Sequence, residues 1–228
     1  MHESVLVLFD IDGTLLDVHG AGRRAFARSL EQCFGWKDDL KSIRFAGATD
    51  LDLLHRLIRE RGREATPEDE RAFFGQLIRE LEAAMPVARL VIHPGVKPLL
   101  EKLGGDPRCL LGLVTGNIET CAWFKLRLFD LHGHFLLGAF GHEHGDRNEI
   151  ARLALRRAEA RTGRAFEKIF LIGDTPNDVR AAKTIGAKAV AVATGSFTRD
   201  ELIATGADHV LDDLGDLAAM MRLLGLNP

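Results

Sequence analysis

The sequence predicts an α/β protein whose core is a Rossmann-like parallel sheet with helices on both faces. Short apolar runs of strand length recur along the chain, and amphipathic stretches of helical length separate the later runs. One long gap between the first and second runs carries helical patterns only. We therefore expect a core domain with an inserted all-helical cap domain.

The predicted strands are short, rich in aliphatic residues and stopped by polar residues or glycine, which favours buried parallel strands over buried helices. They cover residues 5–9, 110–114, 135–140, 169–172 and 189–193, with 209–211 as a further candidate. The helical stretches between the later runs cover 118–129, 147–161 and 176–185. Strands that alternate with helices predict a parallel sheet.

The spacing of the strands is uneven. About a hundred residues separate the first strand from the second, whereas later strands follow at roughly the length of one strand–helix–strand unit. Helical patterns at 21–34, 51–61 and 67–85 fill the gap, and Thr66 and Pro67 are suited to the N-cap and first position of the third. We predict a core of residues 1–15 and 93–228 and a cap of residues 16–92.

Composition and charge limit the functional classes. The chain has 228 residues, is 46% hydrophobic and carries a net charge of -3, which provides no basic field for nucleic acid or an anionic membrane. The apolar run 5–9 is too short to span a bilayer and does not resemble a signal peptide. Three unclustered cysteines fit a reducing compartment. We expect a cytoplasmic protein with a small-molecule partner, and its oligomeric state stays open.

Acidic and small polar residues follow three of the predicted strands, where ligands bind in open α/β sheets. They are Asp10 and Asp12 after the first strand, Thr115, Gly116 and Asn117 after the second, and Asp174 and Asp178 after the fourth. Four carboxylates gathered in one crevice repel one another unless a cation neutralises them. Because all the ligands are oxygens, the sequence predicts a hard cation, Mg²⁺.

Aspartates after strands are also common as turn residues and helix N-caps, and that explanation suffices for Asp174 and Asp178 taken alone. The run from Asp10 to Leu15, Asp-Ile-Asp-Gly-Thr-Leu, is much rarer by chance. Its place directly after the first strand, with the other groups in order behind it, favours a functional site.

In these motifs the sequence resembles the haloacid dehalogenase superfamily, in particular its phosphoglycolate-phosphatase-like members with a helical cap. Asp10 and Asp12 match the first motif of the family, Thr115 the second, and Asp174 with Asp178 the fourth. The third motif is a lysine in the family, but no lysine occurs between Lys125 and Lys168. Arg147 is the candidate substitute.

The resemblance implies a mechanism and roles. Asp10 would be the nucleophile that forms an aspartyl-phosphate, and Asp12 the general acid and base. Mg²⁺ would be held by Asp10, the backbone carbonyl of Asp12 and Asp174, with Asp178 as a further ligand or a support. Four residues would bind the transferring phosphoryl group: Thr115, Gly116, Asn117 and Arg147.

Cap residues are open to two interpretations. Arg23 and Arg24 could bind a substrate carboxylate, although helix arginines are usually solvated. Thr49 and Asp50 could contact substrate or simply form an N-cap and a turn. His142, His144 and Asp146 could be drawn as a zinc site, but we expect surface polar residues there.

These observations predict a Mg²⁺-dependent phosphatase acting on a small phosphomonoester such as phosphoglycolate. A phosphotransferase such as a sugar phosphomutase of the same superfamily is the first alternative, because it would share every motif. A non-catalytic module that binds phosphate is the second, although such a module has no use for a nucleophile and an acid. A dehalogenase is disfavoured because those relatives lack the second aspartate, which is present here as Asp12.

Overall fold

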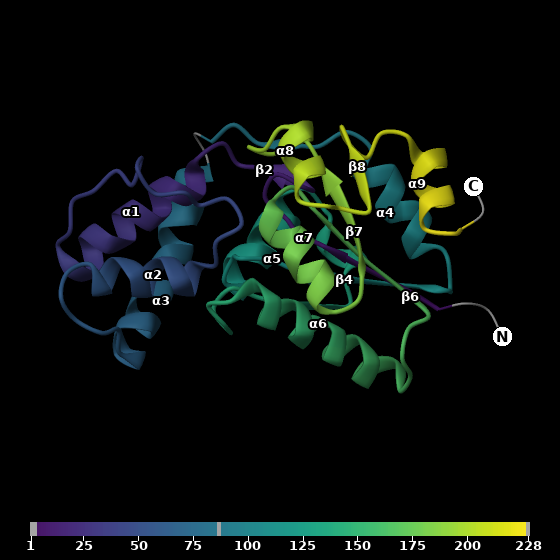
Figure 1. Ribbon diagram of the computed structural model, residues 1–228. Coiled ribbons are helices and arrows are strands. Elements are labelled where there is room, and N and C mark those ends of the chain that lie inside the picture. Colours follow the sequence, from purple (N-terminus) through teal and green to yellow (C-terminus); the bar gives the residue numbers. More distant parts are fainter. Residues whose placement is uncertain (1–3, 86–87, 227–228) are drawn as a thin grey trace.

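The computed structural model describes residues 4–85 and 88–226 of the chain. Its main sheet has six strands in the order β5-β4-β1-β6-β7-β8, and each pair of neighbours is parallel (Figure 1). The strands are β1 (Val5–Phe9), β4 (Cys109–Val114), β5 (Leu137–Ala139), β6 (Lys168–Gly173), β7 (Lys188–Val192) and β8 (His209–Leu211). The predicted α/β class is confirmed. Because β1 lies between β4 and β6, the carboxyl ends of these three strands are adjacent.

Helices cover both faces of the sheet, and the alternation of side chains along β1 shows how. Val5, Val7 and Phe9 belong to one buried cluster, and Leu6 and Leu8 to another on the opposite face. The first cluster includes residues of α4 (Val96–Gly104), α5 (Glu119–Leu128) and α9 (Leu217–Leu223). The second includes residues of α6 (Arg147–Thr162), α7 (Pro176–Thr184) and α8 (Arg199–Ala204). Burial on both faces explains why the strands read as continuous apolar runs.

The segment between β1 and β4 forms three helices beside the sheet, at the left of Figure 1: α1 (Ala21–Phe34), α2 (Asp50–Arg59) and α3 (Pro67–Ala84). Thr66 caps α3 in a reciprocal pair with Asp69, with Pro67 in the first turn as predicted. The rings of Phe26 and Phe73 meet edge to face with centroids 4.7 Å apart, which joins α1 to α3. The division into a core and a cap of residues 16–92 stays a prediction.

Several elements escape the sequence pattern. The short helices α4, α8 and α9 were not predicted, nor was the antiparallel pair of β2 (Leu16–Asp17) and β3 (Val91–Ile92), nor the 3-10 turn His132–His134. The strand predicted at 135–140 is shorter in the structure, where β5 covers Leu137–Ala139, and the phenylalanines that flank it make ring contacts. Phe135 packs on Phe9 and Phe140 on Trp123, each with centroids 5.9 Å apart. Among the described residues, no helix has the length and apolar character to cross a membrane.

Candidate active site

Asp10 and Asp12 lie where β1 ends, at the centre of the sheet. The backbone N–H of Asp10 donates to the Ile172 carbonyl (2.9 Å), which extends the pairing with β6 to this residue. Gly13 then turns the chain with φ +79°, and a Cβ at Gly13 would lie 2.5 Å from Oδ2 of Asp174. Both the backbone conformation and the contact therefore require glycine in the Asp-Ile-Asp-Gly run.

Three buried carboxylates converge beside this turn. Asp10, Asp174 and Asp178 each offer an oxygen within 4.8 Å of the others. Burial raises the pKa of Asp10 to about 6, against the opposing charge of Arg147 and with added repulsion from Asp178 and Asp12. The pKa of Asp174 is raised well above its ordinary value, mainly by burial and to a smaller extent by the charges of Asp10 and Asp178. A divalent cation would remove this repulsion, and a purely oxygen donor set fits Mg²⁺.

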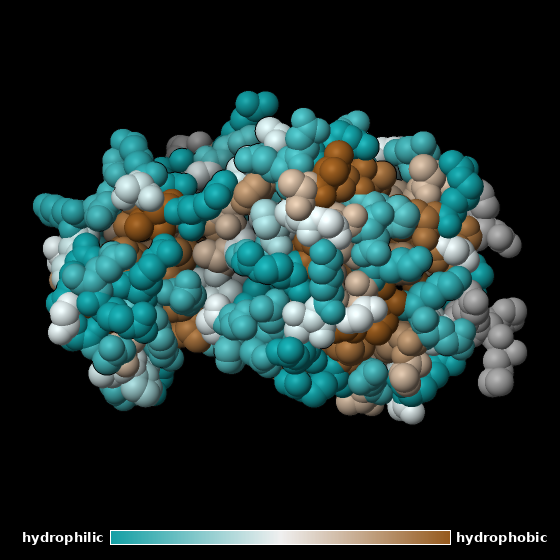
Figure 2. Space-filling model, in the orientation of Figure 1, coloured by the Kyte–Doolittle hydropathy of each residue, from teal (hydrophilic) through white to brown (hydrophobic). Residues whose placement is uncertain are grey.

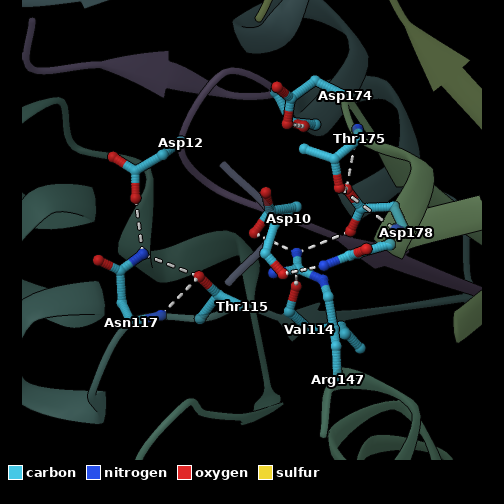
Figure 3. A network of polar contacts seen from close by, with 12 residues as sticks. Asp10, Asp12, Val114, Thr115, Asn117, Arg147, Asp174, Thr175 and Asp178 are labelled. Atoms are coloured by element: carbon cyan, nitrogen blue, oxygen red, sulfur yellow. Dashed lines mark hydrogen bonds and ion pairs between the residues drawn. The ribbon is translucent and has the colours of Figure 1, made fainter. Parts of the chain in front are cut away.

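Arg147, at the first position of α6, inserts between these carboxylates (Figure 3). Its Nη2 lies 2.7 Å from Oδ1 of Asp10 and 2.7 Å from Oδ1 of Asp178, and it donates to the Val114 carbonyl at 3.2 Å. The side chain is only 5% exposed. Burial alone would lower its pKa, but the charges of Asp10 and Asp178 reverse the direction. Arg147 is thus a fixed cation against the nucleophile candidate, at the place where the sequence predicts the third-motif substitute.

For Asp178 the sequence left two interpretations open, a helix cap and a residue of the site, and the structure shows contacts of both kinds. Its Oδ2 accepts hydrogen bonds from the backbone N–H (3.0 Å) and the hydroxyl (2.6 Å) of Thr175, which completes the capping box of α7. Its Oδ1 faces Arg147. One oxygen of Asp178 therefore caps α7, and the other contacts the guanidinium of Arg147.

Asp12 is held by a second set of contacts. The amide of Asn117 donates to Oδ2 of Asp12 (2.6 Å) and to the hydroxyl of Thr115 (2.8 Å) (Figure 3). Lys125 donates from Nζ to both oxygens of Asp12 (2.7 Å each) and to Oδ1 of Asn117 (2.8 Å). The Asp12 side chain is 40% exposed, whereas that of Lys125 is 4% exposed. The carboxylate is thus fixed in place yet open to the cavity, and the phosphate-binding role expected of Asn117 stays a prediction.

Lys125 also belongs to the site, but the sequence did not predict that it would hold Asp12. Burial is the largest single influence and lowers its pKa, but the charge and hydrogen bonds of Asp12, with smaller contributions from Cys121 and Asp50, together outweigh burial, so the pKa is raised and the ammonium is retained. The sequence contains one signal for this role, a lysine placed between the apolar residues Phe124 and Leu126. In the structure, Lys125 lies on a buried face of α5. Lys168, the first lysine after Arg147 in the sequence, begins β6 beside Val5, at the other end of the sheet from Asp10.

The start of α2 and the loop before it contact the loops that follow β4 and β5. The backbone N–H of Asp50 donates to the Gly116 carbonyl (2.8 Å), and Oδ2 of Asp50 accepts from the N–H of Ile118 (2.8 Å). Thr49 caps α2 and donates to the Gly145 carbonyl (3.0 Å). A Cβ at Gly116 would lie 2.0 Å from the Ala48 carbonyl oxygen, so glycine permits this close approach. In the structure, Thr49 and Asp50 therefore fix the start of α2 against the loops at the carboxyl end of the sheet.

The remaining candidates separate into two groups. Arg23 and Asp50 line a cavity with Asp10 and Asp12, whereas Arg24 and Thr49 lie outside its lining. Arg24 is exposed and donates to the His19 carbonyl (3.3 Å), so the structure does not bring it to the site.

Among the described residues, His142, His144 and Asp146 do not bring ligand atoms together as a metal site would, whereas Asp10, Asp174 and Asp178 do. His142 accepts from the N–H of Glu119, and His144 from the N–H of Asp146. Each histidine thus makes a separate local contact, as surface polar residues do.

Comparisons with known proteins agree with this geometry. A family model described as haloacid dehalogenase-like hydrolase matches residues 5–186. The phosphoglycolate phosphatase of Synechococcus elongatus is 28% identical over 92% of this chain and 94% of its own length. The protein CbbY of Cereibacter sphaeroides is 27% identical over 95% of each chain. A structure from Bacteroides vulgatus, assigned as a β-phosphoglucomutase, superposes with a TM-score of 0.72 at 21% identity, over 98% of this chain and 89% of the other. The matched model covers the strands and motifs that build the site, and the chain belongs to the haloacid dehalogenase-like hydrolases.

Proposed function

We propose that this protein is a Mg²⁺-dependent phosphatase that hydrolyses a small phosphomonoester through an aspartyl-phosphate on Asp10. One observation carries the proposal. Asp10 is paired with Arg147, lies beside Asp174 and shares one cavity with Asp12. A nucleophile, a fixed cation, metal ligands and a proton donor thus meet at one end of a single cavity.

The protein's own groups supply the chemistry. An oxygen of Asp10 attacks phosphorus, and the bond from phosphorus to the leaving-group oxygen breaks. Asp12 gives its proton to that oxygen, and in the second step takes a proton from the water that hydrolyses the aspartyl-phosphate. The contacts from Lys125 and Asn117 hold Asp12 in position for both transfers.

Asp10, Asp174 and the carbonyl of Asp12 would hold Mg²⁺, with Asp178 close by. When bound, the ion offsets the repulsion between carboxylate and phosphate and polarises the phosphoryl group. Arg147 adds a second positive charge from the protein side. Thr115, Gly116 and Asn117, which line the same cavity, are the candidate contacts for the remaining phosphoryl oxygens.

We also propose that residues 16–92 act as a cap that closes over the substrate, and that the enzyme works in the cytoplasm. The hydrogen bonds that Asp50 makes with Gly116 and Ile118 would hold such a cap in a closed position. Closure of this kind excludes water from the reacting groups.

The test is phosphate release from p-nitrophenyl phosphate by purified protein, with Mg²⁺ and with excess chelator. Activity should require the metal and disappear in Asp10→Asn, because an amide is neither a nucleophile nor an anionic ligand. Acid-quenched wild-type enzyme should carry an acyl phosphate that the variant lacks. Substantial turnover by Asp10→Asn would refute the covalent route.

A phosphotransferase is the alternative function, because the fold is similar to that of a structure assigned as a β-phosphoglucomutase. At 21% identity, this similarity shows the fold alone. A mutase would convert a hexose 1-phosphate into its 6-phosphate when primed with a bisphosphate, whereas a phosphatase would form no hexose 6-phosphate and would release inorganic phosphate from p-nitrophenyl phosphate. A non-catalytic phosphate-binding module would bind phosphate and turn nothing over. One assay of both products therefore distinguishes the three.

A further inference from the structure

The cavity that contains Asp10 extends into the cap and changes character along the way. Its volume is about 390 Å³, within the range of about 300–1,000 Å³ typical of small-molecule sites. The core end is lined by the carboxylates and by Thr115 and Asn117. The cap end is lined by Val18, Phe26, Phe45, Leu53, Leu77 and Leu81.

The cap end is both apolar and sequestered. Phe26, Leu53, Leu77 and Leu81 are each at most 4% exposed, and they come from three different helices. The outer surface of these helices is mainly hydrophilic on the face shown in Figure 2, so this apolar lining is turned inward. Apolar side chains of this kind give a charged group no replacement for its lost hydration.

The cations around the cavity are largely committed. Of the described lining residues, three carry a positive charge, and Arg147 and Lys125 are ion-paired to aspartates. The third, Arg23, donates to the Leu40 carbonyl and lies over the ring of Phe45, 4.9 Å from its centroid. Asp50 adds a carboxyl group whose pKa burial raises to about 6, which agrees with low polarity at this end. A second anionic group on the substrate would therefore meet one cation, Arg23, which these two contacts hold in place.

We infer that the leaving group of the substrate is an apolar alcohol, either a branched or linear alkyl group or an aromatic ring, and not a carboxylate-bearing or sugar alcohol. The inference rests on the proposed phosphatase function and adds the substrate class. The phosphoryl group occupies the charged core end, and the carbon skeleton fills the cap end against Phe45 and the three leucines.

The sharpest test compares two substrates of the same shape. Isobutyl phosphate has the heavy-atom skeleton of phosphoglycolate, with two methyl groups in place of the two carboxylate oxygens. Its kcat/KM should exceed that of phosphoglycolate by roughly tenfold or more, because burial of an unpaired carboxylate is costly. Along methyl, ethyl, propyl and butyl phosphate, kcat/KM should rise roughly three- to fourfold per methylene until the cavity is full.

Two matched variants tie the preference to the lining. Phe45 and Phe74 are both partly buried phenylalanines of the cap, but Phe45 lines the cavity and Phe74 does not. Phe45→Ala should flatten the dependence on chain length, whereas Phe74→Ala should preserve it. Circular dichroism and thermal unfolding show whether both variants are folded.

The outcomes separate the inference from the function on which it rests. Phosphate release with no rise along the alkyl series, or a higher kcat/KM for phosphoglycolate or a hexose phosphate than for isobutyl phosphate, overturns the apolar leaving group and leaves the phosphatase intact. In the phosphoglycolate case Arg23 would be the cation to examine. Equal slopes in the two phenylalanine variants overturn the assignment to this lining. No Mg²⁺-dependent release from any of these esters or from p-nitrophenyl phosphate refutes both proposals.

Discussion

Arg147 offers the most direct test of the site, because one nitrogen of its side chain contacts both Asp10 and Asp178 at 2.7 Å. In Arg147→Ala, phosphoryl oxygens lose a fixed positive charge in a buried setting. By comparison with the loss of one oxyanion donor, we expect a cost of about 2–4 kcal/mol in transition-state stabilisation, which is a fall of roughly 30- to 1,000-fold in kcat/KM.

The same substitution should weaken the metal-free fold. Removing one partner from a buried ion pair typically costs about 3–5 kcal/mol, because the remaining charge is left uncompensated. The three buried carboxylates would then depend on a bound cation, so Mg²⁺ should raise the melting temperature of Arg147→Ala more than that of the wild type. This dependence separates an electrostatic role from simple loss of packing.

Arg147→Lys is the matched control. Since a single nitrogen makes both carboxylate contacts, an ammonium can replace its charge, although the shorter side chain and the loss of the fixed guanidinium geometry reduce the fit. We expect part of the lost activity to return. The assay is kcat/KM with a good and a poor leaving group at saturating Mg²⁺. Wild-type kinetics in Arg147→Ala, in a folded protein, would refute the assignment of the third-motif cation.

Four further perturbations test the rest of the site. Asp12→Asn should nearly abolish turnover of alkyl phosphates, which need a proton donor, and substantial activity on them would contradict that role. Lys125→Met should lower kcat for alkyl phosphates by roughly tenfold or more and should lower kcat for p-nitrophenyl phosphate less. The reason is that the lost contacts position Asp12, the proton donor that alkyl leaving groups need. Equal losses for the two kinds of substrate would indicate that Lys125 has a structural role alone. Saturating Mg²⁺ at about 100 times its Kd should stabilise the wild type by about 2.7 kcal/mol in chemical unfolding and chelation should reverse this, whereas Asp174→Asn should show little response. Burial raises the pKa of Asp50 from 3.8 to about 6, so its contribution to stability is complete below about pH 4 and lost as pH rises through 6. The unfolding free energy of the wild type relative to Asp50→Asn should therefore fall by up to about 3 kcal/mol between pH 4 and 7, and parallel pH curves would count against a buried Asp50.

The sequence by itself determined the fold class and predicted which polar groups meet at one edge of the sheet. Strands buried on both faces are written as continuous apolar runs, so β1, β4, β6 and β7 could be located to within a residue or two. Parallel strands end at one edge of the sheet, so the polar residues that follow them had to meet. Asp10, Asp12, Thr115 and Asp174 were found in this way because local pattern and topology gave the same answer.

Only the tertiary structure decided which groups pair and what surrounds them. Nothing in the spacing shows that Lys125, on a helix, reaches back to Asp12, or that Asp50 binds the backbone before α5. The apolar end of the cavity is likewise assembled from three successive helices and the loop between the first two, which meet only through their tertiary packing. Helix periodicity reports that a residue is buried, but not whether it is buried against its own domain or against a ligand cavity. That distinction depends on long-range packing, which one sequence does not encode in any local pattern.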